Sequence, residues 1–322
     1  GYVGTKSNFL QRARPLNTVR PGLVVPATSL ADETARIADY RAINAGLNAP
    51  PTGTTNRIDP RFTGVTLNES SANSNYHSFQ AYLARTFRSG FGFTAAYTWS
   101  KSIDDISDVL NVIATDTPSQ QNPFNNRDNR AVSGFDVPHR FVFTHSYALP
   151  KFANTNRFVR TLVGGWNLSG IFQMQSGNPI NILSGARLAL PDPILLGGNG
   201  ALRPNLDGPL NLTFAPNPGT VNAADFKTTA SGLSQPLVGN FGTLGRNVIR
   251  INGLTQYDAT LQKDFVLTER VRLQAQSQFF NIFNNTQFSR PGVSLAAPAA
   301  FGYYQDTDTN SRNITLVLRL IW

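Results

Sequence analysis

Short stretches in which apolar and polar residues alternate are the feature that most constrains this 322-residue chain. Side chains of a β-strand point alternately to its two faces, so the alternation predicts strands with one apolar and one polar face. The pattern occurs in eight stretches, at residues about 1–11, 76–87, 91–100, 139–150, 164–177, 255–267, 271–280 and 311–322. The sequence therefore predicts an all-β fold.

The connections between these stretches alternate between short and long. We expect long polar loops at about 12–74, 101–135, 177–254 and 284–311, and short connections elsewhere. If the strands run up and down, every short connection falls at one end and every long loop at the other. Outer-membrane barrels have this asymmetry, with short periplasmic turns and long extracellular loops. The predicted fold class is an antiparallel up-and-down transmembrane β-barrel with about eight strands in this chain.

A soluble β-sandwich has the same alternation, with its apolar faces turned inward. Connections as long as 12–74 and 177–254 exceed the few residues usual between the strands of a compact sandwich. A secreted sandwich that binds glycans through Tyr and Trp is an alternative, but Trp99 and Trp166 lie within predicted strands rather than in loops. The loop lengths and these positions favour the barrel.

The composition narrows the possible partners. Charged residues make up 15% of the chain, against about 25% in a typical soluble domain. The net charge is +9, but Lys and Arg are scattered, so we expect no nucleic-acid partner.

Cysteine is absent, which excludes disulfides and Cys-based metal or redox sites. The sequence has no run of eighteen apolar residues, so it predicts no transmembrane helix. The opening GYVGTKSNFLQ lacks the apolar core of a signal peptide, so we expect a piece of a longer protein.

The final stretch has a regular row of apolar residues. Ile314, Leu316, Leu318 and Leu320 stand at every second position before the terminal Trp322. An exposed apolar edge strand is an aggregation hazard in a soluble protein. Outer-membrane barrels resemble one another in ending on such a row and an aromatic residue, a pattern read by the barrel-assembly machinery. We expect that machinery and outer-membrane lipid to be partners of this strand.

Several strings together resemble the C-terminal barrel of Oar-like TonB-dependent receptors, large proteins that often carry a carboxypeptidase-regulatory-like domain. The strings are YVGTKSNFL, NYHSFQAYLARTF, GFGFTAAYTWSKSIDD, FDVPHRFVFTHSYALP, GGWNLSGIFQMQSGNP and YDATLQKDFVLTERVRLQAQSQFFNIFNNTQF. The resemblance implies a barrel of about twenty-two strands in the bacterial outer membrane, closed around a plug and energised through TonB. Residues 1–322 would be the C-terminal part of that barrel domain, with TonB contacted through the missing N-terminal part.

Two alternatives stay open at this point. The chain could close on itself, but an eight-stranded barrel has room only for side chains, so we favour a piece of a larger barrel. The implied function is transport of an unknown substrate across the outer membrane. The alternative is a surface-exposed structural or adhesive protein that uses its long loops to bind an unknown surface partner.

An acidic run, SIDDISD, follows one predicted strand. Asp104, Asp105 and Asp108 could supply the oxygen ligands that calcium prefers. The glycine and the closing glutamate of an EF-hand loop are lacking, so we favour a solvated acidic loop. No nucleophile elbow, His–Glu pair or phosphate-binding loop occurs in the sequence. We therefore find no catalytic or cofactor-binding residues and expect a protein that is not an enzyme.

Three further features give local expectations. Asp136 lies near His139 and Arg140, and we expect a salt bridge among them where the strand enters the membrane. Lys263 interrupts an apolar face, where a charge costs about 2–4 kcal/mol at mid-bilayer, so we expect it to snorkel or to sit at a bulge. Acidic residues after Ser29 predict a short helix near 30–44, as decoration outside the barrel.

Overall fold

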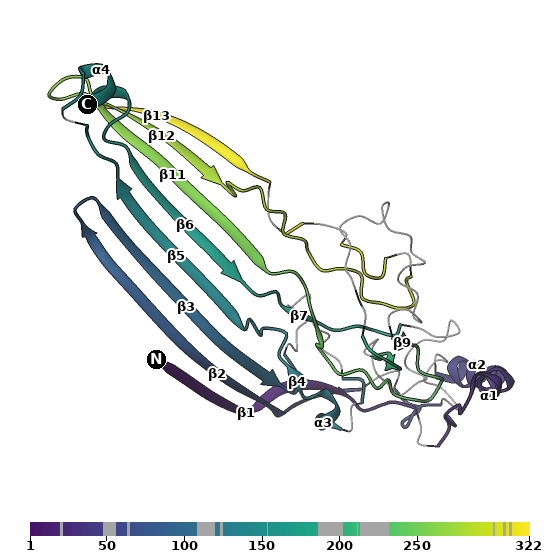
Figure 1. Ribbon diagram of the computed structural model, residues 1–322. Coiled ribbons are helices and arrows are strands. Elements are labelled where there is room, and N and C mark those ends of the chain that lie inside the picture. Colours follow the sequence, from purple (N-terminus) through teal and green to yellow (C-terminus); the bar gives the residue numbers. More distant parts are fainter. Residues whose placement is uncertain are drawn as a thin grey trace.

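The computed structural model describes residues 1–19, 22–47, 56–62, 65–107, 120–122, 125–152, 154–185, 202–210, 212, 232–298, 300–304, 307–308 and 311–322. One long antiparallel sheet dominates it (Figure 1). Its main strands are β1 (Tyr2–Pro15), β2 (Thr66–Arg88), β3 (Phe91–Asp104), β5 (His139–Ala148), β6 (Asn167–Gln175), β11 (Leu254–Val266), β12 (Arg272–Phe280) and β13 (Asn313–Ile321). They lie side by side in chain order, and the short β4 (Ala131–Val132) pairs with β3. The predicted all-β, up-and-down arrangement is confirmed.

The two faces of the sheet differ in polarity across neighbouring strands. On one face, Phe279 of β12 lies between Ala259 of β11 and Ile314 of β13. One residue earlier on β12, Gln278 lies on the opposite face, between a threonine of β11 and a threonine of β13. The registers therefore align the predicted apolar positions into one continuous surface, here called the apolar face, and the opposite surface is the polar face.

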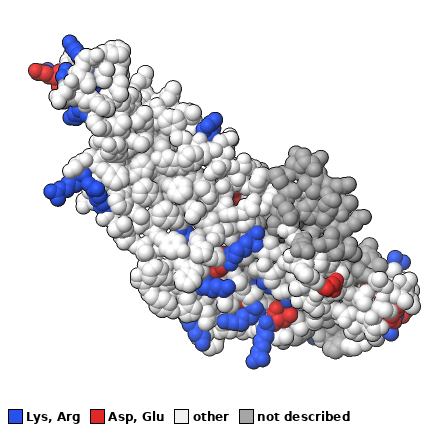
Figure 2. Space-filling view, in the orientation of Figure 1, with Lys and Arg blue, Asp and Glu red and all other residues white. Residues whose placement is uncertain are grey.

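The apolar face is exposed in this chain. Leu316 and Leu318 are 75% and 71% exposed, and Leu83 on the far side of the sheet is 62% exposed. Soluble proteins rarely expose an apolar surface that is continuous over so many strands. Figure 2 shows few charged side chains over the middle of the sheet, with Lys, Arg, Asp and Glu gathered toward its two ends. A hydrocarbon layer is the environment that suits this surface.

All short connections lie at one end of the sheet, here called the turn end. A two-residue turn joins β2 to β3, with φ values of 55° at Ser89 and 81° at Gly90. Positive φ at both positions is typical of the hairpin turns whose twist matches that of the strands. The connection between β5 and β6 is longer and contains helix α4 (Arg157–Leu162). The predicted hairpin at 76–100 is thus confirmed.

The opposite end, here called the loop end, carries the long connections 16–65, 105–138, 176–253 and 281–312. Their described parts hold small elements: α1 (Leu30–Ala35), α2 (Ile37–Leu47), α3 (Asn126–Asn129), and the two-stranded pairs β7 (Pro179–Ile180) with β10 (Ile249–Arg250) and β8 (Asn205–Leu206) with β9 (Leu233–Ser234). None of the helices in the described residues has the length and apolar character needed to cross a membrane.

The long connections pack together into a body with its own apolar core, here called the cap. Tyr40 of α2, Leu202 and Val238 form one buried cluster. A second cluster joins Ile182, Leu233, Leu244, Leu295 and Phe301. These residues come from three different connections, so the loops stabilise one another instead of extending separately into solvent.

The helix predicted near 30–44 is present as the consecutive helices α1 and α2. The hydroxyl of Ser29 caps α1 by accepting a hydrogen bond from the Asp32 amide at 3.1 Å. We had expected the helix to be decoration outside the barrel, but α1 and α2 are packed into the cap. The Tyr40 side chain is 1% exposed, and the Glu33 carboxylate accepts a hydrogen bond from the Val238 amide at 2.8 Å. That prediction was wrong because it treated each loop in isolation.

Candidate functional site

Three arginines from the connection before β11 form ion pairs with the end of β3 and the connection that follows it, and each pair has at least one buried partner. The pairs are Arg203–Asp128, Arg246–Asp104 and Arg250–Asp136. Each pair joins segments that are far apart in the sequence. Together they fasten one side of the cap to the loop-end rim of the sheet.

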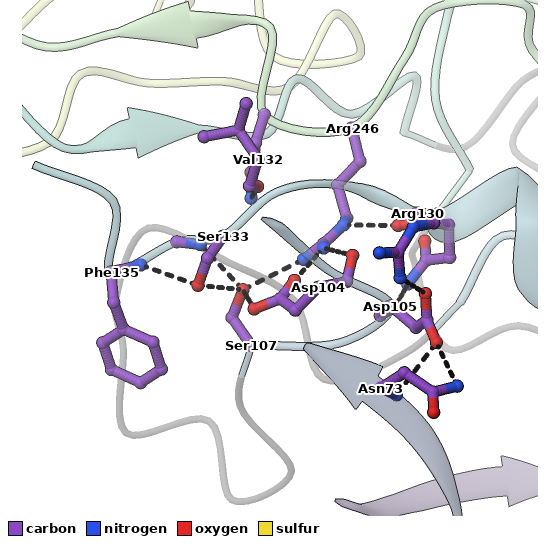
Figure 3. A network of polar contacts seen from close by, with 12 residues as sticks. Asn73, Asp104, Asp105, Ser107, Arg130, Val132, Ser133, Phe135 and Arg246 are labelled. Atoms are coloured by element: carbon purple, nitrogen blue, oxygen red, sulfur yellow. Dashed lines mark hydrogen bonds and ion pairs between the residues drawn. The ribbon is translucent and has the colours of Figure 1, made fainter. Parts of the chain in front are cut away.

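Arg246 lies at the centre of this network (Figure 3). Its guanidinium forms an ion pair with Asp104, the last residue of β3, and donates to the Ser107 hydroxyl at 3.1 Å. It also donates to the carbonyl of Asn129 at 2.9 Å. The side chains of Arg246 and Asp104 are 2% and 4% exposed. Removing one partner would therefore leave the other as an uncompensated buried charge, which costs about 3–5 kcal/mol.

The neighbouring Asp105 has a separate set of partners. Its carboxylate accepts from the backbone and side-chain amides of Asn73 at 2.9 and 3.1 Å, and pairs with Arg130 at 2.9 Å (Figure 3). Asn129 donates to its backbone carbonyl at 2.6 Å. Asp105 thus ties β2 to the segment around α3.

These contacts bear on the calcium hypothesis. Asp104 and Asp105 are only 3% and 4% exposed, so the solvated acidic loop that we had favoured is not what the structure shows. Arginine, rather than solvent, faces both carboxylates, while Asp108 lies outside the described residues. Within the described ranges, no group of three or more His, Asp or Glu side chains could hold a metal ion.

Asp136 has a different partner from the one that we had expected. Its buried carboxylate pairs with Arg250 and accepts a hydrogen bond from the Ser102 amide. The Arg250 guanidinium also donates to the Asp136 carbonyl at 2.8 Å. His139 hydrogen-bonds the Tyr97 hydroxyl instead, at 2.8 Å. The predicted bridge with His139 or Arg140 was wrong because the arginine that fits comes from a connection more than a hundred residues away.

A second ion cluster lies where the pairing of β1 with β2 continues toward the cap. Glu69 of β2 is paired with Arg12, which lies opposite on β1, and with Arg14 at 3.1 Å. Hydrogen bonds from Arg14 and Arg12 lower the pKa of the Glu69 carboxyl to about 2. This cluster explains why β1 and β2 run on to Pro15 and Thr66, into the region that the sequence had predicted as a loop at 12–74.

A recess opens on the polar face just below the cap. It has a volume of about 370 Å³, and its lining includes Tyr76, Thr98, Ser100, Phe135 and Arg140. Hydroxyls, aromatic rings and a guanidinium are groups that bind polar or anionic small molecules. The arrangement can bind a solute but offers no paired nucleophile and base among its described lining residues.

The three histidines lie on the apolar face, and each contacts a tyrosine hydroxyl. The pairs are His77 with Tyr2 at 2.6 Å, His139 with Tyr97 at 2.8 Å, and His145 with Tyr257 at 2.8 Å. A polar group that faces hydrocarbon needs a hydrogen-bond partner, and these pairs supply it. The sequence alone does not reveal these pairs, because each tyrosine lies on a different strand from its histidine.

Lys263 snorkels rather than sitting at a bulge. The pairing of β11 with β12 is regular at this position, where Lys263 lies opposite Ala275. The ammonium group contacts the carbonyl of Gly164 at the turn end and lies 5.7 and 5.1 Å from the ring centres of Trp166 and Phe265. The expectation of a snorkelling lysine is thus confirmed.

The terminal row lies where the sequence had predicted it. Leu316, Leu318 and Leu320 are exposed on the apolar face, and Trp322 is 87% exposed. The chain ends at the turn end of the sheet, the end at which α4 also lies (Figure 1). Recognition of this row by the barrel-assembly machinery stays a prediction.

The match to a family model agrees with this geometry. Residues 1–315 match the family model of the outer membrane beta barrel domain. No curated protein sequence matches the chain. Among solved structures, the outer membrane transporter YddB from Escherichia coli is similar at 12% sequence identity and a TM-score of 0.39. The alignment covers 80% of this chain and 26% of the transporter chain.

Proposed function

Because the chain belongs to the family of outer-membrane β-barrel domains, we propose that it forms part of the wall of a TonB-dependent receptor of the Oar-like type. The family places the protein in the bacterial outer membrane. In this proposal the receptor carries a solute across that membrane. The observation that carries it is the two-faced sheet, whose apolar face suits lipid and whose polar face suits a watery passage.

The positions of the cap and the recess give the order in which an entering solute would meet them. The loop end would face the cell exterior and the turn end the periplasm, as in other outer-membrane barrels. A solute that passes the cap would next meet the recess around Thr98 and Arg140 on the polar face. The plug and the TonB-contacting segment would be supplied by parts of the receptor outside this chain.

Cysteine accessibility tests the watery passage, because the chain has no cysteine of its own. Ala95 and Ala96 are adjacent on β3 and point to the apolar and polar faces respectively. In the full-length receptor, freed of any other cysteine, a small membrane-impermeant maleimide should label Ala96→Cys and not Ala95→Cys. The two variants are matched in residue type, strand and depth.

The outcomes separate the candidate functions. Equal labelling of both variants would contradict the assignment of faces. Failure to label Ala96→Cys in the folded receptor would indicate a closed interior and favour the structural or adhesive alternative. Labelling of Ala96→Cys should also be faster in cells with TonB than in cells without it, and equal rates would contradict the TonB dependence alone.

A further inference from the structure

The apolar face carries a recess at the turn end that the transport proposal does not use. It lies between α4 and the ends of β11 and β12, and its volume is about 680 Å³. Phe265 and Leu273, which are directly opposite each other on the two strands, belong to its lining. The recess therefore opens on the side of the sheet that faces lipid, at the depth where the strands end.

Three cationic side chains line this recess: Lys151, Arg160 and Lys263. Within the described residues, none of the three forms an ion pair. The one acidic residue in the lining, Asp264, points to the polar face, where its carboxylate accepts a hydrogen bond from Gln274 at 3.0 Å. The lining thus has a net positive charge, and in the described part of the chain no carboxylate lies within ion-pair distance of these three cations.

Lys263 gives the strongest indication that the recess binds an anion. Its side chain is 95% removed from solvent, since the residue is only 5% exposed. The ammonium group has three donors, and Gly164 is its one hydrogen-bond acceptor in the described part of the chain. The rings of Trp166 and Phe265 add a cation–π contribution but accept no conventional hydrogen bond. A buried ammonium normally has an anionic partner, so an anionic oxygen at this position would complete its contacts.

The surroundings indicate that the anion belongs to a lipid. Around the cations, the lining is apolar and continues into the apolar face of the sheet. Beside the recess, α4 exposes Phe158 at 71% and Leu162 at 46%, and the next residue, Val163, is 53% exposed. Exposed apolar side chains next to Arg and Lys are typical of a segment that lies in the headgroup layer of a membrane. A free anion would gain nothing from the apolar lining, whereas an acyl chain would cover it.

We propose that this recess binds one anionic phospholipid of the leaflet at the turn end. Lys263, Arg160 and Lys151 contact the headgroup phosphate, and the acyl chains lie along Phe265 and Leu273. The site is on the opposite face of the sheet from the solute recess, so it holds lipid whether or not the receptor transports. It would fix the β5–β6 connection against the barrel wall.

Native mass spectrometry of the full-length receptor, released from detergent micelles, tests the proposal. Dioleoylphosphatidylglycerol should be retained in preference to dioleoylphosphatidylcholine at equal concentrations. The double variant Arg160→Gln/Lys263→Gln should lower phosphatidylglycerol affinity about tenfold or more, as expected for the loss of charge-assisted hydrogen bonds. Arg157→Gln is the matched control, because Arg157 lies on the same helix outside the lining and its loss should change nothing.

Each other result counts against the site. Equal retention of the two lipids, or unchanged affinity in the double variant, would overturn it. Competition by inorganic phosphate at the concentration of the lipid would show that the recess binds the free anion instead. The change at buried Lys263 could prevent folding, in which case Arg160→Gln alone is tested, because Arg160 is exposed. Unchanged phosphatidylglycerol affinity in the Arg160→Gln variant would also overturn the proposal.

Discussion

At the scale of single residues, a glycine allows two polar side chains to meet across an intervening strand. His145 of β5 and Tyr257 of β11 lie on either side of β6, and their hydrogen bond passes over Gly170. A Cβ atom at Gly170 would lie 2.8 Å from His145 Nε2 and 2.8 Å from the nearest Tyr257 ring carbon. Real side chains do not approach so closely, so a methyl group at this position would separate the pair.

Gly170→Ala should therefore destabilise the barrel by about 1–3 kcal/mol, the cost of leaving polar groups without partners in an apolar environment. The measurement is the urea midpoint of the heat-modifiable band in detergent electrophoresis. Gly208→Ala is the control, because a Cβ atom there would have no neighbour within 4 Å. An unchanged midpoint in Gly170→Ala would show that the hydrogen bond contributes nothing to the stability of the sheet.

At the scale of elements, the sequence predicts strands well where one face is apolar and poorly where both faces are polar. The alternation identified all eight main strands, because their apolar positions recur with a period of two. The extension of β1 and β2 toward Pro15 and Thr66 was missed, since it is stabilised by Glu69 and its arginines and not by an apolar row. The ion pair of Asp104 with Arg246 was missed for a related reason: it spans 142 positions, and neither residue type has a period that indicates its partner.

The Glu69 cluster should make this extension sensitive to acid. The folded-state pKa of about 2 lies below the ordinary value of 4.5, so ionised Glu69 stabilises the pairing of β1 with β2 above about pH 4.5. That stabilisation should be lost as the pH falls through about 2, because both the folded and unfolded states are then protonated. The measurement is amide hydrogen exchange at residues 10–14, corrected for the intrinsic effect of pH.

The neutral variant Glu69→Gln supplies the comparison. At pH 7 it should exchange faster than the wild type in this segment, and the difference should shrink between about pH 4.5 and 2. Exchange in β12, which is remote from Glu69, should be the same in both proteins. A difference that stays constant down to pH 2 would show that packing rather than charge stabilises the extension.

At the scale of the whole molecule, the sheet separates two chemically distinct ends. The loop end is held by buried arginine–aspartate pairs and the core of the cap, whereas the turn end has the two-residue hairpin, α4 and the terminal Trp322. This separation was predictable in outline, because short and long connections alternate along the chain. That three long connections share two apolar clusters was not predictable, since the members of these clusters have no common sequence pattern.

Trp322 belongs to this scale, because an aromatic residue at a membrane interface helps to fix the depth of the whole barrel. Trp322→Ala should lower the fraction of full-length receptor that reaches the heat-modifiable, folded form in cells. Ile321→Ala is the neighbouring control, since Ile321 lies opposite Arg272 on the polar face. Equal folded fractions for the two variants would contradict both the anchoring role and the assembly role of the terminal residue.

The chain-order arrangement of the strands has a consequence for chain entropy. Each strand pairs with its immediate predecessor along the main sheet, so every long connection closes a single loop between adjacent strands. The entropic cost of closing a loop grows with the logarithm of its length, by about 0.6 kcal/mol for each doubling. Lengthening a cap segment therefore adds little to the entropic cost of forming the sheet. The same wall can support caps of very different size, and the shape that a solute meets can change without redesign of the strands beneath it.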